Sequence, residues 1–112
     1  MEIIATQRGG VVSLALAGRL DAFSAPRLRQ CLDEAMAQGQ VRLVVDLSNA
    51  PLVDSNGLGV LVSGMKQARQ NGGDLKLAGL QPTTRVIFEL TRLDRAFDIA
   101  DDVEAALAAF QA

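Results

Sequence analysis

The feature that most constrains the fold is a strand, a turn and a helix in direct succession within residues 41–72. Val41–Leu47 is a short, almost unbroken apolar run rich in β-branched residues, which is typical of a strand buried on both faces. Ser48–Pro51 breaks this run. A 3.6-residue apolar period then predicts a helix that ends at Gly72 and buries Leu58, Leu61, Val62, Met65 and Ala68. A second apolar run, Leu75–Ala78, completes a βαβ unit, so we expect parallel strands.

Two strands and a helix are expected before this unit. Ile3–Gln7 and Val11–Ala17 flank a glycine-containing turn, which predicts a hairpin, and we place it at a sheet edge. Ser24 is the expected cap of a helix that ends at Gly39. The apolar stripe of that helix includes Cys31, and packing in the core explains this residue better than a reactive thiol does.

Three elements are expected after residue 78. A helix starting at Pro82 or Thr83 should turn Val86, Ile87 and Leu90 inward, while the orientation of Phe88 stays open. The apolar patch Phe97–Ile99 predicts a short last strand. A final helix should begin at Asp101 with Glu104 as its capping-box partner, and its buried residues should be Val103, Leu107 and Phe110. No linker interrupts the chain, so residues 1–112 are expected to form a single domain.

Composition narrows the class of protein. Hydrophobic residues make up 49% of the chain and charged residues 21%, which is ordinary for a soluble globular protein. No apolar run approaches the roughly 20 residues of a membrane span, and the first residues do not resemble a secretory signal, so we expect a cytoplasmic protein. The net charge is −2 and the basic residues are scattered, which disfavours direct binding to nucleic acid. Without histidine and with one cysteine, the chain is expected to hold neither a metal nor a cofactor.

Asp54–Gly57, at the start of the central helix, is the candidate functional site. Asp, Ser and Asn are all favoured at helix N-caps, so capping alone is one explanation for them. Partner binding is the other explanation, because nearby glycines allow another backbone to approach and each lowers helix stability by about 0.8–1 kcal/mol relative to alanine. The second explanation makes Ser55 an accessible hydroxyl for a partner or a modifying enzyme.

The opposite face of the same helix is a second candidate surface. Projected at about 100° per residue, Val60, Gly64 and Gln67 lie opposite the apolar stripe. This placement predicts a smooth, partly apolar outer face on which a partner docks.

Catalysis by Ser55 is disfavoured. A nucleophilic serine requires a general base within hydrogen-bond reach and an oxyanion hole. The chain has no histidine, Asp54 is adjacent in sequence, and Lys66 lies nearly three helical turns away. We therefore expect an interaction protein and not an enzyme.

Three segments also carry a family resemblance over nearly the whole chain. They are Gly18-Arg19-Leu20-Asp21, Val44-Val45-Asp46-Leu47-Ser48 and Val53-Asp54-Ser55-Asn56-Gly57-Leu58-Gly59-Val60-Leu61. In these segments the chain resembles the STAS family, the sulfate transporter and anti-sigma factor antagonist domain. The resemblance implies an α/β fold, with a mixed sheet of four to five strands and about four helices that lie largely on one face.

The resemblance also implies a function. A bacterial anti-sigma factor antagonist binds a kinase-type anti-sigma factor, which releases the sigma factor. The anti-sigma factor serine kinase phosphorylates the antagonist, here at Ser55, which blocks binding, and a PP2C-type phosphatase restores it. The alternative within the same fold is an interaction subunit of a stress-signalling assembly or a lipid-transport complex.

Residue by residue, the resemblance also concerns Asp21 and Asn56. Asp21 would lie in an acidic loop near the phosphoacceptor, and Asn56 stands where the family more often has Ser, Thr or Ala. With the two regions above, the expected partner-binding residues are Asp21, Asp54, Ser55, Asn56, Gly57, Val60 and Gly64. We expect the free chain to be a monomer or a weak dimer.

Overall fold

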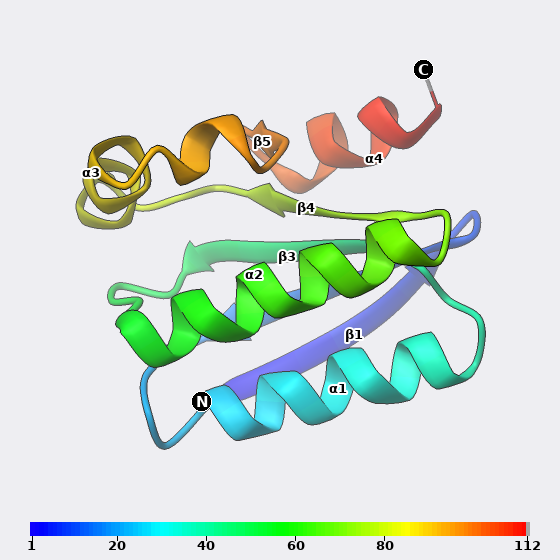
Figure 1. The fold of residues 1–112 in the computed structure, drawn as a ribbon, viewed down its shortest axis with the longest axis horizontal. Helices are drawn as coiled ribbons and strands as arrows, with labels where there is room; N and C mark the ends of the chain where they lie inside the picture. Colours follow the sequence, from blue (N-terminus) through cyan, green and yellow to red (C-terminus); the bar gives the residue numbers. More distant parts are fainter. Residues whose placement is uncertain (112) are drawn as a thin grey trace.

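The computed structural model describes residues 1–111 as a five-stranded sheet packed against helices (Figure 1). The elements are β1 (Glu2–Arg8), β2 (Val11–Ala17), α1 (Ala25–Ala37), β3 (Arg42–Asn49), α2 (Ser55–Gln70), β4 (Asp74–Ala78), α3 (Pro82–Leu90), the 3₁₀ helix η1 (Leu93–Arg95), β5 (Ile99–Ala100) and α4 (Val103–Gln111). Every strand and helix that the sequence predicts is present, with ends shifted by a few residues. None of the helices in residues 1–111 combines the length and the hydropathy needed to cross a membrane.

The sheet is mixed, as expected. Its strand order is β1-β2-β3-β4-β5, in which β1 pairs with β2 antiparallel and every other pair is parallel. The hairpin turn consists of Gly9 and Gly10, with φ values of 57° and 81°. Positive φ at both central residues is the requirement of a type I′ turn, whose twist matches that of the paired strands. The predicted hairpin at a sheet edge is therefore confirmed.

The core has two parts of unequal size. The larger cluster lies between the sheet and α1, α2 and α3 and contains Leu14, Leu28, Val45, Leu61 and Phe88 among its buried residues. α1 and α2 lie side by side in front of the sheet in Figure 1. A smaller cluster packs α4 against β2, β3 and β4, and consists of Val11, Val44, Ala78, Ala106 and Leu107. Because strand residues alternate between faces, the two clusters lie on opposite sides of the sheet, and helices are largely on one side.

The predicted inward face of α3 was wrong in two of its three residues. Val86 and Leu90 are 51% and 79% exposed, whereas Phe88 is fully buried. The Phe88 ring packs edge-to-face on Phe97, with ring centroids 5.6 Å apart. An aromatic pair buries more surface than either aliphatic residue does, and this contact sets the rotation of α3.

The predicted cap of the last helix was also wrong. α4 begins at Val103, and the Asp102 carboxylate accepts a hydrogen bond from the Ala105 backbone N–H at 2.8 Å. Glu104 instead forms a two-pronged ion pair with Arg8 of β1, at 2.7 and 3.1 Å. Glu104 therefore bonds to an arginine that is distant in sequence and does not form the capping box with the start of its own helix.

Candidate functional site

The two motifs that the sequence singles out lie side by side. Leu20 and Val53 form an isolated parallel bridge beyond the ends of β2 and β3. The Leu20 N–H donates to the Leu52 carbonyl at 2.9 Å, and the Asp54 N–H donates to the Leu20 carbonyl at 3.0 Å. The loop before α1 is therefore fastened to the segment that begins α2, and this places Asp21 close to the candidate phosphoacceptor region.

Asp54 is the N-cap of α2. Its Oδ1 accepts hydrogen bonds from the backbone N–H groups of Asn56 at 2.9 Å and Gly57 at 3.1 Å. These bonds satisfy two of the N–H groups that a helix start leaves without partners. Capping therefore accounts for Asp54, and Asn56 contributes through its backbone N–H and through its side-chain amide, which donates to Asp54 Oδ2 at 3.5 Å.

Ser55 is not used as a cap. It is the first residue of α2 and is exposed to solvent. Within residues 1–111 its hydroxyl takes part in no hydrogen bond. The capping explanation thus leaves the Ser55 side chain unexplained, and the hydroxyl is available to another molecule.

The Asp21 side chain forms hydrogen bonds within its own loop. Its Oδ1 accepts hydrogen bonds from the backbone N–H groups of Phe23 at 3.0 Å and Ser24 at 3.1 Å. These bonds, chiefly the one from Ser24, hold the pKa of the Asp21 carboxyl below its usual value. The Ser24 hydroxyl donates to the Arg19 carbonyl at 2.6 Å and accepts from the Asp21 N–H at 2.9 Å. Ser24 is the N-cap residue by position, as predicted, but its hydroxyl bonds within the loop and not to the helix.

This loop displays an apolar side chain that the sequence patterns did not identify. Phe23 is 95% exposed, and Leu52 in the neighbouring loop is about half exposed. A hydrophobic period predicts buried and exposed positions in helices and strands but not in loops. The exposure of Phe23 is therefore apparent only from the structure, in which hydrogen bonds to Asp21 fix the loop. An exposed aromatic ring is a typical anchor for a protein partner.

Val60 and Gly64 do not form an outer face, so the prediction that they do was wrong. Val60 is only 6% exposed and Gly64 is buried. A Cβ on Gly64 would lie 2.9 Å from Leu32 Cδ1 of α1 and 3.1 Å from Leu75 Cδ1 of β4. α2 packs against the sheet and α1 at once, and its buried face is therefore rotated relative to the apolar stripe.

Gly57 is likewise a packing residue. A Cβ there would lie 2.6 Å from Leu20 Cγ and 2.9 Å from the Leu20 carbonyl oxygen. Glycine therefore allows the Leu20 loop to lie directly on α2. Gly59 differs from both, because it is exposed and a Cβ there would meet no atom within 4 Å.

The accessible surface around Ser55 is a groove between α1 and α2. Ala22, Pro26 and Arg29 line one side, and Ser55, Asn56 and Gly59 line the other. Of the residues expected to bind a partner, Ser55, Asn56 and the largely buried Val60 line this groove, and Asp54 caps its helix. Sequence reasoning missed two exposed residues: Gly59, which lines this groove, and Phe23, which lies in the loop before α1.

Comparison with known proteins identifies the family of this chain. The STAS domain profile matches residues 2–106. The anti-sigma-B factor antagonist of Bacillus subtilis is 36% identical over 80% of this chain and 81% of its own, and that of Listeria monocytogenes is 33% identical over 79% and 77%. The crystal structure of an anti-sigma factor antagonist from Mycobacterium paratuberculosis superimposes with a TM-score of 0.90, at 27% identity, over 99% of this chain and 94% of its own. The chain belongs to the STAS domain family.

Proposed function

We propose that this chain is an anti-sigma factor antagonist whose binding to a kinase-type anti-sigma factor is switched by phosphorylation of Ser55. The unphosphorylated chain binds the anti-sigma factor and releases its sigma factor. Phosphorylation at Ser55 prevents binding, and a PP2C-type phosphatase restores it. The curated relatives described above bear the antagonist name, which favours this role over that of a subunit of another complex. The observation that carries the switch is the exposed Ser55 hydroxyl, which the helix cap does not use.

Ser55 is a better acceptor than the other serines beside the two helices. Ser24 is buried and its hydroxyl is bonded on both sides within its loop. Ser63 accepts a hydrogen bond from Arg29 Nη1 at 3.3 Å and is only partly exposed. A kinase must reach the hydroxyl and orient it for attack on the γ-phosphate, and Ser55 is the most accessible of the three.

The first prediction is therefore that the cognate anti-sigma kinase with ATP adds one phosphate, at Ser55. Intact-mass and peptide mass spectrometry check this, with Ser55→Ala as the unreactive variant and Ser63→Ala as the matched control that still reacts. A phosphate on the Ser55→Ala protein would assign the acceptor elsewhere.

The second prediction concerns Gly59, one turn along α2 from Ser55. Gly59→Arg should weaken anti-sigma factor binding by more than about 1 kcal/mol, because a bulky side chain would fill the groove that the partner enters. The fold should be unaffected, since a Cβ at this position meets no atom. Isothermal titration calorimetry measures the affinity, with Gly59→Ala as the small control. Equal affinities for the two variants would exclude this groove from the interface.

A further inference from the structure

β1 is an edge strand without the usual protection. In residues 1–111 it has a strand neighbour on one side only, and its seven residues pair with β2 in an unbroken register. Natural edge strands are commonly shielded by proline, lysine, a bulge or a short length. β1 contains no proline and no lysine, and its charged residues stand at its two ends, Glu2 and Arg8.

The hairpin turn determines which backbone groups point outward. Arg8 and Val11 flank a two-residue turn, so they form the hydrogen-bonded pair that closes it. Hydrogen-bonded and non-hydrogen-bonded pairs alternate along an antiparallel ladder. Ile3, Ala5 and Gln7 therefore direct their N–H and C=O groups away from β2.

One register of self-pairing uses all three outward residues. In an antiparallel pair of two β1 strands centred on Ala5, Ile3 of each copy lies opposite Gln7 of the other. A shift of the centre by one residue in either direction leaves one outward residue of each copy without an opposite partner. The centred register is thus the one with the most interchain hydrogen bonds.

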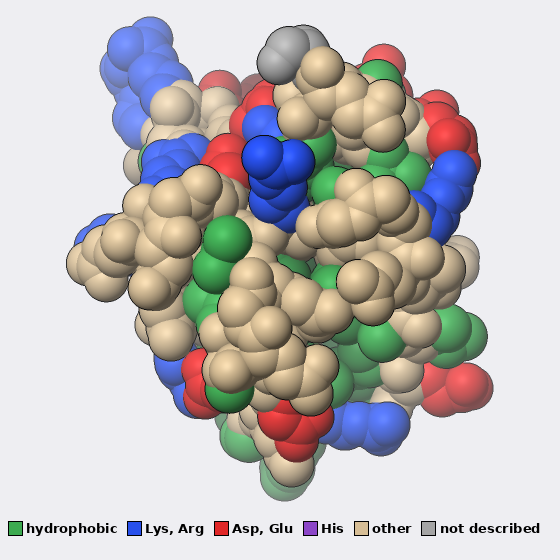
Figure 2. Space-filling model, turned by 90° about the vertical axis from the view of Figure 1, so that its right-hand side faces the viewer, with side chains coloured by type: hydrophobic (Ala, Val, Ile, Leu, Met, Phe, Trp, Pro, Cys, Tyr) green, Lys and Arg blue, Asp and Glu red, His purple; other side chains and the backbone are tan. Residues whose placement is uncertain are grey.

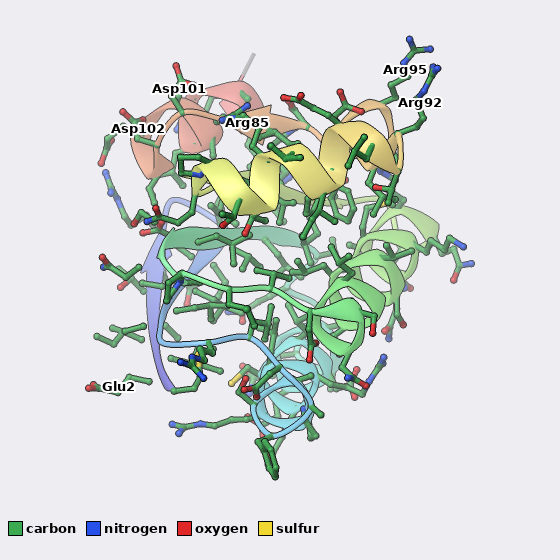
Figure 3. All side chains as sticks on the ribbon, turned by 90° about the vertical axis from the view of Figure 1, so that its left-hand side faces the viewer. Glu2, Arg85, Arg92, Arg95, Asp101 and Asp102 are labelled. Atoms are coloured by element: carbon green, nitrogen blue, oxygen red, sulfur yellow. The ribbon has the colours of Figure 1, made fainter. Side chains whose placement is uncertain are left out.

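The same register also matches charge. It places Glu2 of each copy opposite Arg8 of the other, where Glu2 would add a second carboxylate to the Arg8–Glu104 ion pair that each domain already contains. Glu2 projects away from the body of the domain (Figure 3), and basic and acidic side chains are interspersed on the face at the hairpin end (Figure 2). The centred register also places Ile4, whose side chain is 57% exposed, opposite Thr6 of the other copy.

We infer that the partner of the β1 edge is a second copy of this chain, joined antiparallel about Ala5 into a continuous ten-stranded sheet. The two-fold axis runs between the two β1 strands at Ala5, and none of the residues that line the Ser55 groove belongs to β1. The inference depends on the strand register and not on the proposed phosphoswitch.

Charge exchange tests the register directly. Glu2→Arg and Arg8→Glu each place like charges opposite one another, so each variant alone should raise the dimer dissociation constant by about fivefold or more. An equimolar mixture of the two variants should restore wild-type affinity, because each Arg then faces a Glu. Sedimentation equilibrium from micromolar to millimolar protein measures this, with Glu89→Arg and Arg85→Glu on α3 as charge-matched controls. Arg8→Glu also breaks the intrachain ion pair with Glu104, so Glu104→Gln, which breaks that pair alone, is its second control and should leave the dimer dissociation constant near that of the wild type.

A backbone variant tests the edge independently of charge. Ala5→Pro removes an N–H that points away from β2, so the hairpin keeps its own hydrogen bonds while the dimer loses its central pair. It should be folded by thermal unfolding and monomeric by sedimentation. A wild-type chain that stays monomeric at millimolar concentration, an equimolar mixture that fails to recover, or an Ala5→Pro protein that dimerises normally would each overturn the inference.

Discussion

Gly64→Arg is expected to unfold the domain or to lower its free energy of unfolding by more than about 3 kcal/mol. The side chain would enter the space between Leu32 and Leu75, which are 2% and 0% exposed and cannot move into solvent. Overpacking a core costs about 1–3 kcal/mol, and an unpaired charge buried in the same place adds several more. A small domain has a total stability of about 5–15 kcal/mol, so the loss is a large part of it.

Gly59→Arg is the matched control for this experiment. It is the same substitution in the same helix, one turn and one residue earlier, but at an exposed position with open space around it. Replacing a helical glycine gains about 0.8–1 kcal/mol of helix propensity, so Gly59→Arg should be neutral or slightly stabilising. Urea unfolding followed by circular dichroism measures both variants. Equal stability of the two proteins would mean that α1 and α2 do not pack through Gly64.

Most of the fold could be predicted because its elements are marked locally. The buried strand β3, the hairpin glycines and Gly39 at the end of α1 each combine a hydrophobic pattern with residues suited to a turn. The errors occur where a long-range contact decides between local options. Glu104 pairs with Arg8, 96 residues away, and Phe88 packs on Phe97 across a turn. Sequence periodicity carries no information about such partners.

The start of α2, where the candidate site lies, was predicted, but the orientation of this helix was not. The motif around Ser55 fixed the start of α2 because the cap residue Asp54 is local. The outer face was misplaced because a helix that packs against both a sheet and another helix buries a wider arc than its apolar residues indicate. Gly57 and Gly64 lie in that arc and make close contacts there. Glycine has no side chain, so a hydrophobic pattern does not mark these positions as buried. Phe23 was missed because a loop residue has no period.

Ser55→Asp is expected to abolish most anti-sigma factor binding while leaving the isolated domain folded. At the first position of α2 a carboxylate is favoured by the helix dipole, by about 0.3–1 kcal/mol. The side chain is exposed, and Asp54 already caps the helix, so no native bond is lost. The thermal midpoint should therefore move by only a few degrees, which corresponds to a stability change of about 1 kcal/mol or less.

In the complex the same carboxylate has the opposite effect. It must lose water at a packed surface that already contains Asp54, and an unpaired charge buried in an interface commonly costs several kcal/mol. Binding should fall at least about tenfold, equivalent to 1.4 kcal/mol. Ser55→Asn is the matched neutral control, because it has nearly the size of aspartate without the charge and should retain more affinity. If Ser55→Asp and Ser55→Asn bind equally, size and not charge governs this position, whereas early melting of Ser55→Asp would make the switch a folding switch and not one of the interface.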